Sequence, residues 1–305
     1  AKTIGIAGHV RPDGDCMGSC MSLYNYLKKN RPDLDVRVFL EFVDKKFNII
    51  ENTDQIITTG YDGTKFDLFI SLDTSSLDRL GLNLPFYENA KRTACIDHHA
   101  SNDGYADYNY ILPKASSASE VLYDLLDEDL IDKSIAEPMY MGIAHDSGVF
   151  RFQSTTPKTM RIAANMIEKG VNVNMILEET FFRKTYNQMM VTAKIQSEAV
   201  LALDGKCIYG YCTSEMMEEY GVTTKDLDAV VASIRNVDGV EVAMFLYQLS
   251  ENSYKVSLRS KNYVDVSKIA VENGGGGHVR AAGAEIHGEL NDIINKLLNR
   301  IKQDI

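Results

Sequence analysis

The sequence has no excess of positive charge, and this absence limits the kinds of ligand that the protein is expected to bind. Its 305 residues include 43 Asp and Glu against 32 Lys and Arg, which gives a formal net charge of −11 at pH 7. Proteins that hold long duplex nucleic acid on a broad surface neutralise many phosphates with Lys and Arg. The acidic balance argues against such a surface, but it is compatible with a small anionic substrate in a local pocket.

Paired cysteines and long apolar segments are also lacking. The five cysteines are an odd set without a CxxC pair, which argues against a disulfide framework and a zinc ribbon. No stretch reaches the roughly 18 apolar residues that a membrane-spanning helix requires. The first residues do not resemble a secretion signal. We therefore expect a cytoplasmic protein that does not bind membranes.

The chain is long enough for two domains. In the first half, short apolar and β-branched segments predict strands at 3–8, 36–40, 66–72 and 92–96, with helical patterns between them. This alternation is typical of an α/β fold with a mainly parallel sheet and helices on both faces. A second alternation, beginning at Cys207, predicts a smaller α/β domain. We place the domains at 1–187 and 188–305, with a helical linker at about 180–200.

Several helices can be placed by their apolar spacing and their end signals. Apolar residues from Met17 to Leu27 recur at helical spacing, and this helix should end before Pro32. Within it, Cys16 and Cys20 are four residues apart and are expected to be packing residues. Thr156-Pro157 predicts a helix start. The second half predicts strands at 207–211, 240–248 and 254–258, and helices near 224–234 and 290–305.

Acidic and histidine side chains follow three of the predicted strands, and a further acid ends a helical stretch. They are His9, Asp13 and Asp15; Asp73; Asp97, His98 and His99; and Asp146. Ligands of an open parallel sheet gather beyond the carboxyl ends of its strands. We therefore expect these side chains to converge, although Asp13-Gly14-Asp15 alone is compatible with a turn and Asp73 or Asp146 alone with a helix cap.

Convergence of these groups would create a metal site. Carboxylates packed together are costly unless cations compensate their charge. Carboxylate and imidazole ligands suit Mn²⁺-like or Mg²⁺-like ions better than a closed thiolate zinc site. More than four ligands suggest two ions that share a bridging carboxylate, an arrangement that promotes in-line displacement at phosphorus.

These motifs together resemble the four-motif signature of the DHH phosphoesterase family. The resemblance rests on His9-x3-Asp13-Gly14-Asp15, then Asp73, then Asp97-His98-His99, then Asp146. The later run at 274–283, Gly-Gly-Gly-Gly-His-Val-Arg-Ala-Ala-Gly, resembles the glycine–histidine loop of the DHH-associated C-terminal domain. The two halves cover nearly the whole chain, and the resemblance implies an active site in the cleft between the two domains.

The resemblance also implies a role for each residue in the first half. One Mn²⁺ would take His9 and Asp13, the other would take Asp15, His98 and Asp146, and Asp73 would bridge them. Mg²⁺ and Co²⁺ are alternatives to Mn²⁺. Asp97 would orient a histidine by a hydrogen bond, and His99 would face the scissile phosphate. The catalytic residues would be His99, Asp97 and Asp73.

The second half is expected to bind the substrate. Consecutive glycines let backbone N–H groups approach a phosphate, and His278 adds a donor. Arg259, at the end of a predicted strand, can hold a phosphate with two N–H groups. The expected contacts are Arg259, Ser260, Gly275, Gly276, Gly277 and His278. Two alternatives stay open: a flexible linker at the glycines, and either a helix cap or a substrate contact at 116–120.

Within the family, the chain resembles the oligoribonuclease (nanoRNase) and pAp phosphatase branch. The resemblance implies Mn-dependent hydrolysis, by a two-metal hydroxide attack, of short oligoribonucleotides, linear dinucleotides (pApA, pGpG) or 3′-phosphoadenosine 5′-phosphate (pAp). The partners would be such a nucleotide and, in a homodimer, a second copy. Alternatives are a c-di-AMP phosphodiesterase, an inorganic pyrophosphatase and a non-catalytic nucleotide-binding regulator. The loop at 274–278 counts against the pyrophosphatase, and the complete ligand set counts against the regulator.

Overall fold

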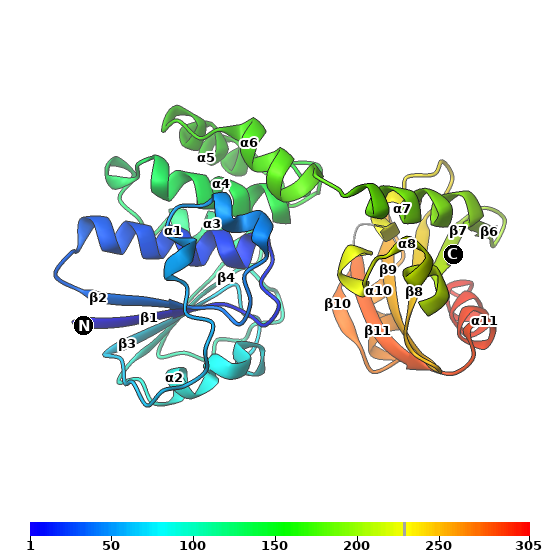
Figure 1. The fold of residues 1–305 in the computed structure, drawn as a ribbon, viewed down its shortest axis with the longest axis horizontal. Coiled ribbons are helices and arrows are strands. Elements are labelled where there is room, and N and C mark those ends of the chain that lie inside the picture. Colours follow the sequence, from blue (N-terminus) through cyan, green and yellow to red (C-terminus); the bar gives the residue numbers. More distant parts are fainter. Residues whose placement is uncertain (228–229) are drawn as a thin grey trace. The chain divides into compact units, whose positions relative to one another are not determined.

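The computed structural model describes residues 1–227 and 230–305, which form two compact units, Ala1–Arg183 and Lys184–Ile305 (Figure 1). The first unit contains a five-stranded sheet in the order β2-β1-β3-β4-β5, in which every neighbouring pair is parallel. Its strands are β1 (Thr3–Ala7), β2 (Asp35–Phe39), β3 (Leu68–Leu72), β4 (Thr93–Asp97) and β5 (Tyr108–Ile111). The prediction of an α/β fold with a parallel sheet is therefore confirmed. Strand β5 was not predicted, because it lies at the sheet edge and none of its residues is buried.

Helices cover both faces of this sheet (Figure 1). One face packs on α1 (Gly14–Asn30), α3 (Ala118–Tyr123) and α4 (Lys133–Asp146) in a large apolar core. The other face buries an aromatic cluster that includes Phe39, Phe69 and Phe86, the last from α2 (Leu84–Glu88). The remaining helices are α5 (Pro157–Glu168), α6 (Val173–Leu177), the 3₁₀ helices Lys45–Ile49, Thr53–Gln55, Leu77–Asn83 and Glu128–Leu130, and the π-helical turn Glu178–Phe182.

Helices α1 and α4 pack closely because glycines lie at the point where the two helices cross. A Cβ atom on Gly18 would lie 2.5 Å from the carbonyl oxygen of Pro138, so no larger residue fits there. Pro138 has no N–H to donate to the carbonyl of Ser134. The side-chain amide of Asn25 on α1 donates to that carbonyl instead, at 2.8 Å. This contact fixes the position of α4, whose last residue is Asp146.

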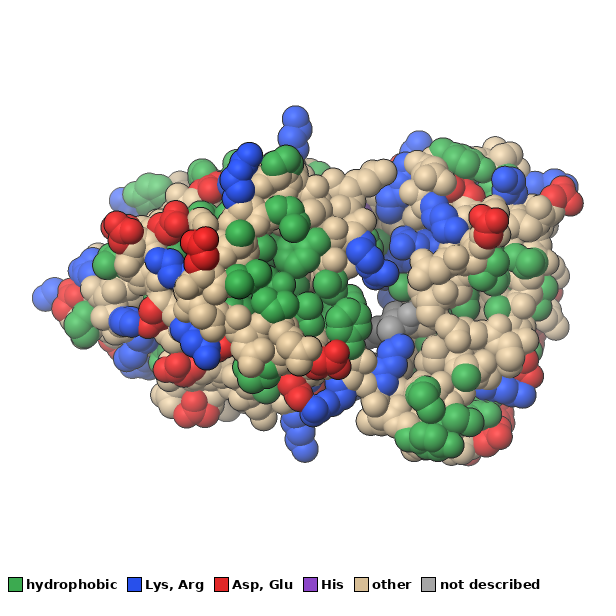
Figure 2. Space-filling model, turned by 90° about the horizontal axis from the view of Figure 1, so that it is seen from above, with side chains coloured by type: hydrophobic (Ala, Val, Ile, Leu, Met, Phe, Trp, Pro, Cys, Tyr) green, Lys and Arg blue, Asp and Glu red, His purple; other side chains and the backbone are tan. Residues whose placement is uncertain are grey.

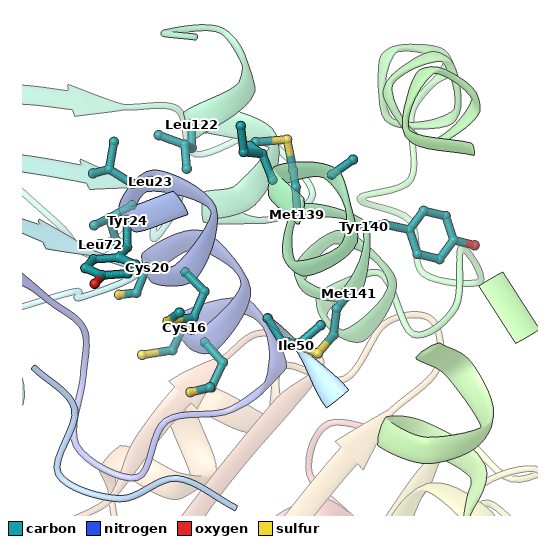
Figure 3. Close-up of a cluster of buried hydrophobic side chains, with 14 of the residues drawn as sticks. Cys16, Cys20, Leu23, Tyr24, Ile50, Leu72, Leu122, Met139, Tyr140 and Met141 are labelled. Carbon is teal, nitrogen blue, oxygen red and sulfur yellow. The ribbon is translucent and has the colours of Figure 1, made fainter. Parts of the chain in front are cut away.

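The cysteines are packing residues, as their positions suggest. Figure 3 shows Cys16 and Cys20 on α1 among apolar side chains of the first core. All five cysteines are free and buried. The prediction that Cys16 and Cys20 contribute to packing is therefore confirmed.

The described residues of the second unit form a six-stranded mixed sheet in the order β10-β11-β9-β8-β7-β6, in which β7 and β8 pair in parallel and the other neighbouring strands are antiparallel. Its strands are β6 (Val200–Ala202), β7 (Cys207–Cys212), β8 (Val242–Ser250), β9 (Ser253–Ser260), β10 (Gly276–His278) and β11 (Ala281–His287). Its helices are α7 (Tyr186–Glu198), α8 (Ser214–Tyr220), the 3₁₀ helix Thr224–Asp226, α9 (Val230–Ile234), α10 (Val266–Val271) and α11 (Leu290–Ile301).

Two predicted helical stretches in this part of the chain are interrupted. In the expected helical linker around 180–200, the backbone leaves the helical conformation at Arg183, and α7 begins afresh with a capping box at Thr185. The helix expected near 224–234 is a 3₁₀ turn followed by α9, and residues 228–229 of it lie outside the described residues.

The surface carries charges of both signs. On the face of the first unit drawn in Figure 2, Lys and Arg side chains are interspersed with Asp and Glu. This mixture agrees with the acidic net charge in arguing against a broad basic surface on that face. Among the described residues, none of the helices has both the length and the apolar character needed to cross a membrane.

Candidate active site

The carboxyl ends of β1, β3 and β4 bring the predicted residues together. His9 follows β1, Asp73 follows β3, and His98 follows β4. The strand order reverses direction beside β1, so the carboxyl ends of β1 and β3 lie at the point where open α/β sheets generally bind their ligands. Asp73, only 3% exposed, lies between two histidines: its Oδ2 is 3.4 Å from His9 Nε2 and its Oδ1 is 3.5 Å from His98 Nε2.

Helix ends supply three further carboxylates. Asp13 caps α1 by accepting from two backbone N–H groups, and its Oδ1 lies 3.8 Å from His9 Nε2. Asp146, the last residue of α4, places Oδ2 3.2 Å from His98 Nε2. Among the described residues, three groups could each hold a metal ion, because the ligand atoms within each group lie within 4.8 Å of one another. The groups are His9, Asp13 and Asp73; Asp15, His98 and Asp146; and Asp73, His98 and His99.

Asp15 is held by the start of α3. Its Oδ2 accepts from the backbone N–H of Ala118 at 2.6 Å, and its Oδ1 accepts from the backbone N–H and the hydroxyl of Ser119 at 3.0 and 2.6 Å. Ser117 caps α3 by accepting from the N–H of Glu120, so the cap interpretation of 116–120 is confirmed. The contact of Ser119 with Asp15 was not predicted from the sequence, because nothing local links Ser119 to a residue about a hundred positions earlier.

Asp97 and His99 form a hydrogen-bonded pair. Asp97 is fully buried, and its Oδ1 accepts from His99 Nδ1 at 2.7 Å and from the backbone N–H of His98 at 2.8 Å. Since an ionised carboxylate only accepts, this bond places a proton on Nδ1 of His99. It leaves Nε2 as the ring atom through which His99 can meet another group.

In the second unit, the glycine run is an ordered edge strand. Gly276–His278 form β10, which pairs antiparallel with β11. A Cβ on Gly275 would lie 2.1 Å from the carbonyl oxygen of Gly283, and one on Gly277 would lie 2.5 Å from that of Ala281. The flexible-linker alternative is therefore wrong. Gly276 differs from its neighbours, because no described atom lies within 4 Å of a Cβ there.

The other residues expected to contact substrate differ in exposure. His278 is exposed on β10, and Arg259 is half-buried near the end of β9, with Nη1 donating to the carbonyl of Leu258 at 3.0 Å. Ser260 is only 1% exposed, and its hydroxyl donates to the carbonyl of Val264 at 2.7 Å. That hydroxyl is engaged within the fold, and a substrate contact at Ser260 stays a prediction.

Comparison with known proteins identifies the chain. The model of the DHH family, N-terminal domain, matches residues 3–143, and that of the DHHA1 domain matches residues 204–304. The bifunctional oligoribonuclease and PAP phosphatase NrnA of Thermus thermophilus is 31% identical, over 98% of this chain and 89% of that protein. This chain belongs to the DHH family. The family resemblance of its motifs is confirmed, and this DHH-family chain is a phosphoester hydrolase.

Further similarities agree with this membership. The bifunctional oligoribonuclease and PAP phosphatase NrnA of Bacillus subtilis is 27% identical, over 93% of this chain and 90% of that protein. The crystal structure of an exopolyphosphatase-related protein from Bacteroides fragilis has a TM-score of 0.91 at 24% identity and covers 99% of this chain and 93% of that one. The second similarity establishes the fold of the DHH-family chain and nothing further.

The electrostatics of this DHH site favour a bound cation. Burial raises the pKa of Asp15 to about 7, and the nearby charge of Asp73 adds to this effect. Burial also raises the pKa of Asp146 well above its usual range. Burial works against the charge of Asp73 too, but the rings of His9 and His98 hold the pKa of its carboxyl low. Crowded carboxylates that retain protons near neutral pH are a donor set that a divalent cation would stabilise.

Metal binding to this DHH site is expected to release protons. Burial opposes the charged form of both rings, but Asp73 and Asp146 raise the pKa of His98 to about 10, and Asp13 and Asp73 also raise the pKa of His9. Both rings are therefore protonated at neutral pH without metal, whereas a histidine ligand must be neutral.

The affinity for Mn²⁺ should therefore increase with pH between about pH 6 and 8, by roughly tenfold per pH unit for each proton released. Calorimetric titration of the metal-free protein with Mn²⁺, in two buffers of different ionisation enthalpy, counts these protons. A pH-independent affinity without proton release would contradict the expectation.

Proposed function

We propose that this chain is an Mn²⁺-dependent phosphodiesterase and phosphatase of short nucleotides, with two ions in the site of the first unit. Its substrates would be short oligoribonucleotides, linear dinucleotides such as pApA and pGpG, and pAp. The observation that carries the proposal is the position of Asp73, with one carboxylate oxygen toward His9 and the other toward His98. The names of the relatives from Thermus thermophilus and Bacillus subtilis support nucleotide substrates.

The ligand groups suggest how two ions would be held. His9 and Asp13 would hold one ion, and Asp15, His98 and Asp146 the other, in agreement with two of the three groups of ligand atoms. Asp73 would serve both ions. When bound, the ions would supply positive charge at the phosphate and lower the pKa of water at the site.

The chain itself contributes orientation and proton control. The hydrogen bond from His99 Nδ1 to Asp97 fixes the orientation of the ring, so that its Nε2 side would face the phosphate. The hydrogen bonds from Ala118 and Ser119 fix both oxygens of Asp15 before any substrate arrives. Such fixed groups reduce the reorganisation that the reaction requires.

Substrate binding is assigned to the second unit, as part of the proposal. Between Ser253 and Gly283 the sequence has five basic residues against two acidic ones, which differs from the acidic balance of the whole chain. His278 and Arg259 would supply donors to phosphate, and Gly276 would allow a close approach of the backbone. The acidic remainder of the chain suits short substrates better than long duplexes.

A substrate panel tests the proposed function. Purified protein with Mn²⁺ would be given pAp, pApA, pGpG, longer oligoribonucleotides, c-di-AMP and pyrophosphate, and the products would be separated by chromatography. We expect turnover of pAp and the linear dinucleotides. Turnover of c-di-AMP alone or pyrophosphate alone would replace the substrate assignment, and nucleotide binding without hydrolysis of any compound would favour the non-catalytic alternative.

Replacing His278 by Ala should separate substrate binding from metal binding. Loss of one charge-assisted hydrogen bond of about 1.5–3 kcal/mol corresponds to a roughly 10- to 100-fold decrease in kcat/KM. Metal content should be unchanged, because His278 belongs to the second unit. The matched control is His287→Ala. His287 is an exposed histidine and the last residue of β11. Loss of metal in His278→Ala, or equal kinetic effects in both variants, would contradict the assignment.

A further inference from the structure

Asn102 is a buried asparagine whose side chain joins two parts of the candidate site. It lies in the segment after β4 and is 8% exposed. Its Nδ2 donates to Asp97 Oδ2 at 2.7 Å and to the carbonyl oxygen of Thr74 at 3.1 Å. Its Oδ1 accepts from the backbone N–H of Gly104 at 2.9 Å, which fixes the orientation of the amide.

The first partner of Asn102 is the carboxylate that orients His99. Asp97 uses Oδ1 for His99 Nδ1 and the His98 backbone, while Oδ2 receives the amide of Asn102. The hydrogen bonds to these two oxygens together fix the plane of the fully buried carboxylate. Without Asn102, Oδ2 would lose a donor in a buried position, which is unfavourable, and Asp97 could rotate together with the His99 ring.

The second partner of Asn102 is the carbonyl of Thr74, the residue after Asp73. Asp73 has a φ of 52°, a left-handed conformation that is uncommon outside glycine. The next carbonyl, that of Thr74, accepts from Asn102 Nδ2 and from the Tyr105 hydroxyl at 2.8 Å. Such a conformation persists where the surroundings hold it from several sides. Asn102 therefore contacts both the segment of the bridging carboxylate and the carboxylate of the Asp97–His99 pair.

We infer that Asn102 is a positioning residue for catalysis, which sets His99 through Asp97. The inference rests on the proposed function, since it concerns the same reaction. Asn102 supplies no atom to a metal or a substrate. Its loss should therefore lower kcat and leave KM and metal content nearly unchanged.

The test replaces Asn102 by Leu, which has a similar shape and cannot form hydrogen bonds. Removal of such an outer partner typically lowers activity by about 10- to 100-fold, and we expect this loss in kcat, with KM within about twofold of the unmodified protein. Tyr105→Phe is the comparison, because it removes the other donor to Thr74 and leaves Asp97 intact. Its loss in kcat should be below about threefold, and the double variant Asn102→Leu/His99→Ala should be no slower than His99→Ala alone.

A second readout does not depend on turnover. ¹⁵N spectra of the histidine rings should give His99 one tautomer, protonated on Nδ1, in the unmodified protein and in Tyr105→Phe, and a mixed signal in Asn102→Leu. If Asn102→Leu fails to fold, judged by its melting curve, Asn102→Ser carries the same expectations. An unchanged kcat, an equal loss in Tyr105→Phe, or an unchanged His99 signal would overturn the inference. Absence of hydrolysis in the unmodified protein, with the His99 signal altered as expected, would instead count against the proposed function.

Discussion

Replacing Asp73 by Asn is expected to abolish phosphoester hydrolysis. The substitution keeps the shape of the side chain, and Asn tolerates the left-handed φ of 52° at this position. It removes the negative charge that lies between His9 and His98. Positive charge supplied by bound metal is worth several kcal/mol to the reaction, so the loss of a shared ligand should lower kcat by about 10³-fold or more.

Metal content and folding give this prediction its control. Asp73→Asn should bind fewer ions than the unmodified protein, measured by elemental analysis after dialysis, while its circular dichroism stays the same. Asp78→Asn, an exposed aspartate five residues later, should match the unmodified protein in both respects. A kcat reduced by less than about tenfold, with full metal content, would show that Asp73 does not bridge two ions.

Replacing Gly142 by Ala is expected to destabilise the first unit and damage the site. Alanine normally stabilises a helix interior by about 1 kcal/mol relative to glycine. In α4, however, the added Cβ would lie 2.0 Å from the hydroxyl oxygen of Ser119 and 2.7 Å from Asp15 Oδ1. Overpacking of this kind costs about 1–3 kcal/mol. The displaced Asp15 could no longer serve as a ligand, and a shift of about 1 Å in such a group can lower activity by about 10²-fold.

The sign of the change in stability distinguishes overpacking at Gly142, which is destabilising, from helix propensity, which favours alanine. Denaturant unfolding should give Gly142→Ala a lower free energy of unfolding than the unmodified protein, and a metal titration should show weaker binding. Gly60→Ala is the control, because a Cβ there would lie 3.7 Å from the nearest described atom, which is ordinary contact. A Gly142→Ala variant that is more stable than the unmodified protein, with full metal binding, would refute the packing argument.

Much of the first sheet could be predicted because each strand carries its own signal. Strands β1 to β4 are short segments with buried residues, and the ends of β1, β3 and β4 are marked by His9, Asp73 and Asp97. By contrast, β6 is largely exposed and β10 consists of two glycines and a histidine, so neither shows a strand pattern. Their pairing depends on the neighbouring strands rather than on their own residues.

The substrate residues were less predictable than the residues of the first unit. A substrate contact at Ser260 was predicted from its place at the end of a strand and from the family resemblance. In the structure, its hydroxyl donates to the carbonyl of Val264. The glycine run suggested an open loop, whereas Gly275 and Gly277 are required by the close approach of β11. Exposure and hydrogen-bond partners decide such roles, and neither is visible in the order of residues.

The sequence by itself determined the fold class, the family and the set of acids and histidines that gather at the strand ends. These follow from periodicity and from motifs a few residues long, which depend on local backbone geometry. The tertiary structure alone decided how that set is held. Asp15 receives its hydrogen bonds from Ser119, about a hundred residues away, and Asp97 reaches the Thr74 segment through Asn102. Such contacts arise only when whole elements pack together, because their partners share no local pattern that a sequence could display.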